Sequence, residues 1–132
     1  MSVPRQELET RLAAFAASNS LTVAYEGRHF DKPSTAFLEC TIIGRNTKNV
    51  TTDGERKRER GIFQVNVWYP TGTPTSGAGT VEAIAESIIA TFPVVPKVGN
   101  VSVEETPNQG SIITDVAGWL VLPVTISYRY ES

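Results

Sequence analysis

Histidine and cysteine are almost absent from this sequence, which has one residue of each, His29 and Cys40. A zinc cluster or a multi-histidine site needs several such side chains, so both kinds of metal site are excluded. A single cysteine also cannot form an intrachain disulfide, which favours a reducing compartment or a fold that does not rely on oxidation. We therefore expect neither a metal nor another cofactor.

Long apolar runs are missing as well. No apolar stretch approaches the roughly 20 residues that a membrane-spanning helix needs. The N-terminal segment has no apolar core preceded by positive charge, so we expect no secretory signal peptide and no membrane partner. The formal net charge of −2 argues against wholesale nucleic-acid binding, although it permits a local basic patch.

The sequence has no recognisable catalytic motif. His29 lies in a polar stretch beside Phe30 and Asp31, a setting more typical of an exposed residue than of a catalytic base. Cys40 falls on the apolar phase of a predicted strand, which indicates a buried, unreactive thiol. No serine has the G-x-S-x-G context, and the glycines of residues 72–79 lack the Gly-Lys-Ser/Thr of a phosphate loop. We expect a protein that is not an enzyme; a small hydrolase is dismissed only by a structure without a convergent polar pocket.

The clearest structural signal is an alternating run from Arg60 to Pro70. Apolar and polar side chains there fall on opposite sides of an extended chain, which is the period of a half-buried strand. The apolar side consists of Phe63, Val65, Val67 and Tyr69. Further strands are predicted at residues 21–25, 36–44, 97–105 and 118–130. Pro123 cannot donate a ladder hydrogen bond, so the last strand is expected at a sheet edge or with a bulge at that position.

Two segments place apolar residues at helical spacing. Residues 4–19 bring Leu8, Leu12 and Phe15 to one face, and a second such helix ends at Pro93. Helices with one apolar face and strands joined by hairpins predict an α+β fold. We expect an antiparallel or mixed sheet of four to five strands with two helices packed on one face. The 132 residues are enough for a single domain over residues 1–132 with its own core.

Residues 45–60 form the most charged segment of the chain. They contain six cationic and three anionic residues, a net charge of +3 against −2 for the whole chain. The cationic residues are Arg45, Lys48, Arg56, Lys57, Arg58 and Arg60. Because no buried-face periodicity is present, we predict a long, mobile basic loop between two antiparallel strands. It is either a solvated loop or a basic finger that reaches toward DNA or an acidic protein surface.

One face of the predicted sheet carries more large apolar side chains than a monomer leaves exposed over one area. Either a loop or another subunit must cover this face, and tryptophan is a residue that often anchors interfaces. The candidate subunit interface consists of Phe37, Ile43, Ile62, Gln64, Trp68, Trp119 and Val121.

The order of segments resembles the lambda-like tail terminator family of long-tailed bacteriophages. The most characteristic segments are GIFQV at residues 61–65 and PVTISYR at residues 123–129. Supporting segments are the alanine-rich first helix, the basic loop, AESI at residues 85–88 and the Phe92-Pro93 pair. The resemblance extends over most of the chain.

The resemblance implies a structural virion protein that forms a ring, expected to be hexameric, on the head-proximal end of the tail tube. Such a ring ends tube polymerisation and presents a joining surface for the head. The implied partners are further copies of the chain, the major tail tube protein and a head-completion or connector protein, with passive contact to DNA in the lumen. The implied location is the virion tail, with assembly in the host cytoplasm.

A nucleic-acid-binding α+β module that uses the 45–60 loop is the alternative. It requires Phe63 and Tyr69 to be exposed for base stacking. Their shared phase with Val65 and Val67 predicts instead that they are buried.

Overall fold

The computed structural model describes residues 3–28, 30–31, 33, 35–49, 57–71, 78–94, 101–113 and 118–131. Within them lie two helices, α1 (Val3–Ser18) and α2 (Ala78–Thr91). The same residues form one sheet of six strands: β1 (Thr22–Ala24), β2 (Phe37–Asn49), β3 (Lys57–Pro70), β4 (Val101–Val103), β5 (Asn108–Gln109) and β6 (Trp119–Glu131). The α+β class with two helices is confirmed. The sheet has more strands than the four to five that we expected.

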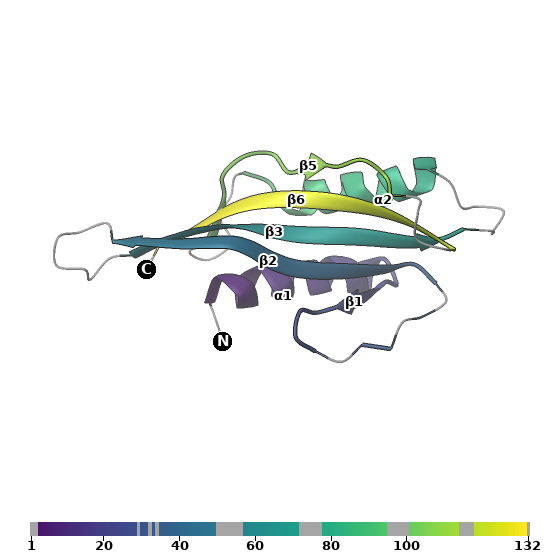
Figure 1. Ribbon diagram of the computed structural model, residues 1–132, viewed down its shortest axis with the longest axis horizontal. Helices are drawn as coiled ribbons and strands as arrows, with labels where there is room; N and C mark the ends of the chain where they lie inside the picture. Colours follow the sequence, from purple (N-terminus) through teal and green to yellow (C-terminus); the bar gives the residue numbers. More distant parts are fainter. Residues whose placement is uncertain are drawn as a thin grey trace.

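Three long antiparallel strands, β2, β3 and β6, form the centre of the sheet. The strand order is β1-β2-β3-β6-β4, and β5 also pairs with β6. Because β1 runs parallel to β2 while all other pairs are antiparallel, the sheet is mixed. Both helices lie on the same side of it, α1 beside β1 and β2, and α2 beside β3 and β6 (Figure 1).

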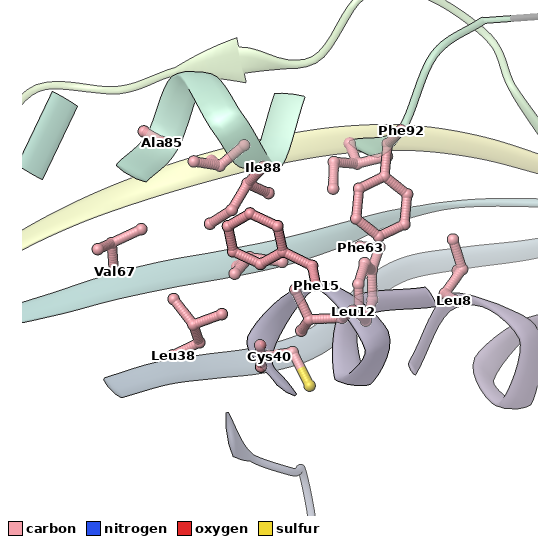
Figure 2. Packing of buried hydrophobic residues seen from close by; sticks show 14 of the residues in the cluster. Leu8, Leu12, Phe15, Leu38, Cys40, Phe63, Val67, Ala85, Ile88 and Phe92 are labelled. Carbon is pink, nitrogen blue, oxygen red and sulfur yellow. The ribbon is translucent and has the colours of Figure 1, made fainter. Parts of the chain in front are cut away.

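The alternating patterns identified the core-facing side of the sheet correctly. Phe63, Val65 and Val67 are fully buried, together with the alternate residues of β6 from Leu122 to Tyr128. Figure 2 shows the helix side chains meeting this face, with Leu12 and Phe15 of α1 and Phe92 at the end of α2 gathered around Phe63. The Phe63 and Phe92 ring centroids are 6.0 Å apart.

The predicted edge position of the last strand is wrong. β6 is an interior strand, with β3 on one side and β4 and β5 on the other. Pro123 is tolerated there because its carbonyl faces the short β5 side, where the Gly110 amide donates to it at 2.8 Å. In an antiparallel strand the amide and carbonyl of one residue point the same way, so the missing donor of Pro123 also faces this irregular neighbour and not β3.

The predicted loop at residues 45–60 is much shorter in the structure. β2 continues to Asn49 and β3 begins at Lys57, so only residues 50–56 separate them, and these lie outside the described residues. The two strands extend beyond both helices at the left of Figure 1. We call residues 45–60 the β2–β3 hairpin. At the base of this hairpin is a β-bulge, where two residues of β2, Gly44 and Arg45, lie opposite one residue of β3, Gly61. The φ of Gly44 is +64°, a value that glycine adopts without strain.

Candidate interaction surface

The outer face of the sheet, on the side away from the helices, carries an aromatic cluster at one end. The Phe37 ring stacks on Trp68 with centroids 5.5 Å apart, and Trp119 meets both rings edge-on at 5.3 and 6.0 Å. Phe30, from the β1–β2 connection, packs against Phe37 at 5.2 Å. Strand register produces this cluster, because Phe37, Trp68 and Val121 are direct neighbours across β2, β3 and β6. All seven residues of the predicted interface come from these three strands.

The seven residues differ in how much surface they offer. Phe37 and Val121 are each only 4% exposed, because neighbouring side chains of the same chain already cover them. Ile62, Gln64, Trp68 and Trp119 are half-buried. Ile43 is 44% exposed and is the residue of the set most available to a partner. Ile113, which is 43% exposed, was not predicted; it lies beside Val121 through a backbone bridge that only the fold reveals.

A row of polar side chains follows the aromatic cluster across the outer face. Asn66 donates to Glu39 Oε1 at 3.0 Å, and the indole Nε1 of Trp68 donates to the same oxygen at 3.3 Å. Gln64 donates to Asn66 Oδ1 at 3.0 Å and extends the row. The Glu39 carboxylate is therefore held in place by two neutral donors, and the salt bridges of the described residues do not include it.

The hairpin end of the outer face is cationic. Arg60 and Arg129 are direct neighbours across β3 and β6, and Arg60 forms an ion pair with Glu104 at 3.4 Å. Arg58 lies two residues before Arg60, nearer the start of β3, and is half-buried. Of the other predicted basic residues, Arg45, Lys48 and Lys57 lie on β2 and β3, and Arg56 falls outside the described residues. The basic residues are thus distributed along two paired strands as well as their connection.

An open groove of about 760 Å³ separates the β1–β2 connection from the outer face of β2 and β3. Its sheet wall includes Glu39, Thr41 and Trp68, and its other wall includes Arg28 and Phe30. The Arg28 guanidinium lies over the Tyr25 ring at 4.9 Å from the centroid. Aromatic rings together with a carboxylate form a setting that favours a cationic side chain.

Glu26 fixes one end of this groove. Its Oε1 accepts a hydrogen bond from the Ile42 amide at 3.2 Å and forms an ion pair with Arg5 at 2.8 Å. The carboxylate lies beside β2 at a point beyond the end of β1. It therefore accepts the hydrogen bond of the Ile42 amide, which β1 does not extend far enough to pair. The hydrogen bond from the Ile42 amide, with smaller contributions from Thr41 and Arg5, lowers the pKa of Glu26.

We expect Glu26→Gln to reduce the free energy of unfolding at neutral pH by about 1 kcal/mol or less, since the Glu26 side chain is 41% exposed. A carboxylate whose pKa is lowered in the folded state stabilises the protein at pH values above its unfolded-state pKa of about 4.3. This stabilisation is lost as the pH falls through the folded-state pKa. Urea unfolding at pH 7 and pH 3 measures the difference, which should shrink at pH 3. Glu82→Gln, at an exposed position on α2, is the control. An equal loss at both pH values would contradict the role of the Glu26 charge.

Cys40 is buried, as predicted. Burial, with a smaller effect of the nearby Glu9 charge, raises its pKa to about 12. No group of three or more metal-binding side chains occurs among the residues that the structure describes. His29 lies outside them, so its predicted exposure stays a prediction. The alternative function, nucleic-acid binding, required Phe63 and Tyr69 to be exposed for base stacking. Phe63 is 0% exposed and lies in the core, so it is not available for stacking.

The fold and this surface were compared with known proteins. The family model described as phage tail terminator protein matches residues 5–128. The chain belongs to the phage tail terminator family. One solved structure superposes on this terminator-family chain with a TM-score of 0.72 and 27% sequence identity, over 96% of this chain and 92% of that chain. The search of curated proteins found no match.

Membership confirms the resemblance seen in the sequence and places this terminator-family chain among the structural components of the phage virion tail. Within the described residues, neither helix has the length and apolar character to cross a bilayer.

Proposed function

We propose that this tail terminator-family protein forms a closed, six-membered ring on the head-proximal end of the tail tube. The ring ends tube polymerisation and presents the joining surface for a head-completion or connector protein. DNA passes through its lumen with only passive contacts. Assembly takes place in the host cytoplasm before the ring becomes part of the virion.

The observation that carries this proposal is the outer face of the sheet. Among the described residues three large hydrophobic side chains are exposed; Ile43 and Ile113 lie on this face, and the third, Val94, follows α2. The half-buried Ile62, Trp68 and Trp119 lie between them on β3 and β6. Family membership supplies the tail context, and an apolar face of this kind supports its burial against another protein subunit.

Ile43→Glu tests the proposal at the most exposed apolar position. A buried, unpaired carboxylate at a subunit contact should reduce assembly about tenfold or more, while the folded monomer should be almost unaffected. Val94→Glu is the matched control, because Val94 is 40% exposed against 44% for Ile43. Sedimentation velocity and negative-stain images of the purified protein, alone and with tail tube protein, give the oligomeric state and the length of capped tubes. A wild-type chain that stays monomeric and leaves tube growth unchanged would contradict the ring.

A further inference from the structure

The groove beside Glu39 has the chemistry of a site for a cation. Glu39 Oε1 accepts hydrogen bonds from Asn66 and Trp68, which orient the carboxylate without neutralising it. Among the described residues no ion pair satisfies its charge. The Trp68 ring and Phe30 line the same groove. A carboxylate oriented by neutral donors beside aromatic rings attracts an arginine or lysine side chain through both its charge and the rings.

The β2–β3 hairpin provides a ligand of this kind. Its residues 45–60 carry a net charge of +3, whereas the whole chain has −2. The paired strands that carry its described residues, β2 and β3, extend past both helices (Figure 1). A basic hairpin and an aromatic groove whose Glu39 carboxylate has no ion pair within the described part of the chain are complementary in charge.

The hairpin cannot fill the groove of its own chain. Glu39 lies near the start of β2, and the strand continues in one direction to Asn49. At roughly 3.3 Å per residue, this stretch separates Glu39 from Asn49, the last residue of β2, by about 30 Å. A rigid strand that is paired with β3 from Asn46 to Asn49 cannot fold back over that distance. Cationic residues of the hairpin therefore reach such a groove only on another copy of the chain.

We propose that the groove beside Glu39 receives the β2–β3 hairpin of a second copy of this chain, with a cationic side chain beside the Glu39 carboxylate and the aromatic rings that line the groove. This inference rests on the proposed ring and names its subunit contact. Each copy uses its hairpin on one neighbour and its groove on the other. Such a head-to-tail contact is heterologous, and it gives a closed ring when the rotation between neighbours divides a full turn.

Charge reversal on each side of the contact is the test. Glu39→Lys, and separately Arg56→Glu with Lys57→Glu, should each reduce the assembled fraction about tenfold, because both place like charges at a close contact. Combining the three substitutions in one chain should restore most of the assembly. Glu82→Lys makes the same charge change at an exposed position of α2 and should leave assembly unchanged. Sedimentation velocity over a concentration series, with and without tail tube protein, measures the assembled fraction.

A second variant separates loss of the contact from loss of the fold. Glu39→Gln keeps an oxygen that accepts from Asn66 and Trp68 but removes the charge, so it should fold normally and reduce assembly about threefold or more. Circular dichroism and thermal unfolding check each variant. If the wild-type chain forms rings and folded Glu39→Lys and Glu39→Gln form them equally well, the hairpin contact is wrong while the ring stands. If the wild-type chain forms no ring, the proposed function is wrong and this contact falls with it.

A direct probe of the groove is a synthetic peptide of residues 45–60. Titrated into the assembly-deficient Arg56→Glu, Lys57→Glu chain, it should shift the NMR signal of the Trp68 indole N–H, which donates to Glu39. The same peptide with Arg56 and Lys57 replaced by glutamate should shift this signal at least about fivefold less at equal concentration, as expected for a charge-dependent contact. Equal shifts with both peptides, or none with either, would overturn the assignment.

Discussion

Phe37→Ala should lower the free energy of unfolding of the isolated monomer by about 3–5 kcal/mol, the usual cost of removing a buried phenylalanine. The sequence placed Phe37 in a subunit interface, where its removal would affect assembly and leave the monomer intact. In the structure Phe37 is 4% exposed, and its ring contacts Phe30, Trp68 and Trp119. The outer face therefore has a small core of its own at this end of the sheet.

Ile43→Ala on the same face of the same strand is the matched control for this prediction. Ile43 is 44% exposed, so its truncation should cost the monomer less than about 1 kcal/mol. Urea unfolding, at a concentration where the chain is monomeric, measures both variants. A Phe37→Ala monomer as stable as Ile43→Ala would mean that the aromatic cluster contributes only to contacts between subunits.

The two variants also divide the outer face into parts with different roles. Phe37 and Val121 are buried by their own chain, so they shape the surface without offering area to a partner. Ile43 and Ile113 offer area, and Glu39 with Trp68 offers a directional site. A partner that contacts this face therefore meets apolar patches, which offer area for burial, and a polar row, which fixes orientation.

The core could be predicted because its information is local in the sequence. Alternation placed Phe63, Val65 and Val67 on one side, and all three are fully buried. Helical spacing likewise placed Leu8 and Leu12 against the sheet, and both are buried. A hydrophobic period of two or of 3.6 residues can be recognised from neighbouring sequence positions alone, so it can be identified without knowledge of the fold.

The hairpin could not be recognised as strand for the opposite reason. β2 and β3 extend beyond both helices there (Figure 1), and the side chains of Asn46, Thr47 and Arg60 are exposed, so no buried side imposes a pattern on them. Their order comes from backbone pairing, with β2 on one side of β3 and β6 on the other. Charged residues are compatible with such pairing, and composition alone therefore predicts a loop.

The groove was missed because it depends on register. Glu39, Asn66 and Pro123 are direct neighbours across β2, β3 and β6, although they are far apart in the sequence. Read along β2 alone, Glu39 only interrupts an apolar face. Placed beside Asn66 and Trp68, it becomes an oriented carboxylate. A shift of one residue in either pairing would remove this site, and no local pattern specifies which register forms.

Gly61→Ala should lower the free energy of unfolding by about 1–3 kcal/mol, the cost of overpacking a filled core. A Cβ at this position would lie 2.8 Å from the Tyr128 hydroxyl oxygen and 2.9 Å from its Cε1. Tyr128 is fully buried, and its hydroxyl donates to Glu59 Oε2 at 2.6 Å, so the ring has no free direction in which to move. The Tyr128 ring, from the neighbouring strand β6, covers Gly61 of β3.

The same substitution elsewhere in the chain gives the opposite sign. Gly79 lies on α2, where a Cβ would meet nothing within 4 Å. Gly79→Ala should therefore raise the free energy of unfolding by about 0.5–1 kcal/mol, since alanine loses less backbone entropy than glycine in a helix. Chemical unfolding of the two variants under identical conditions measures both signs.

A double-mutant cycle shows whether the Tyr128 ring is the cause of the Gly61→Ala effect. Tyr128→Leu destabilises the chain by itself but removes the atoms that a Cβ at residue 61 would meet. In that background Gly61→Ala should cost less than about 0.5 kcal/mol, so the two substitutions should be coupled by 1 kcal/mol or more, roughly the range for residues in contact. Additive effects would mean that Gly61 is needed for the backbone of β3 opposite the bulge at Gly44 and Arg45, and not for the space beside the ring.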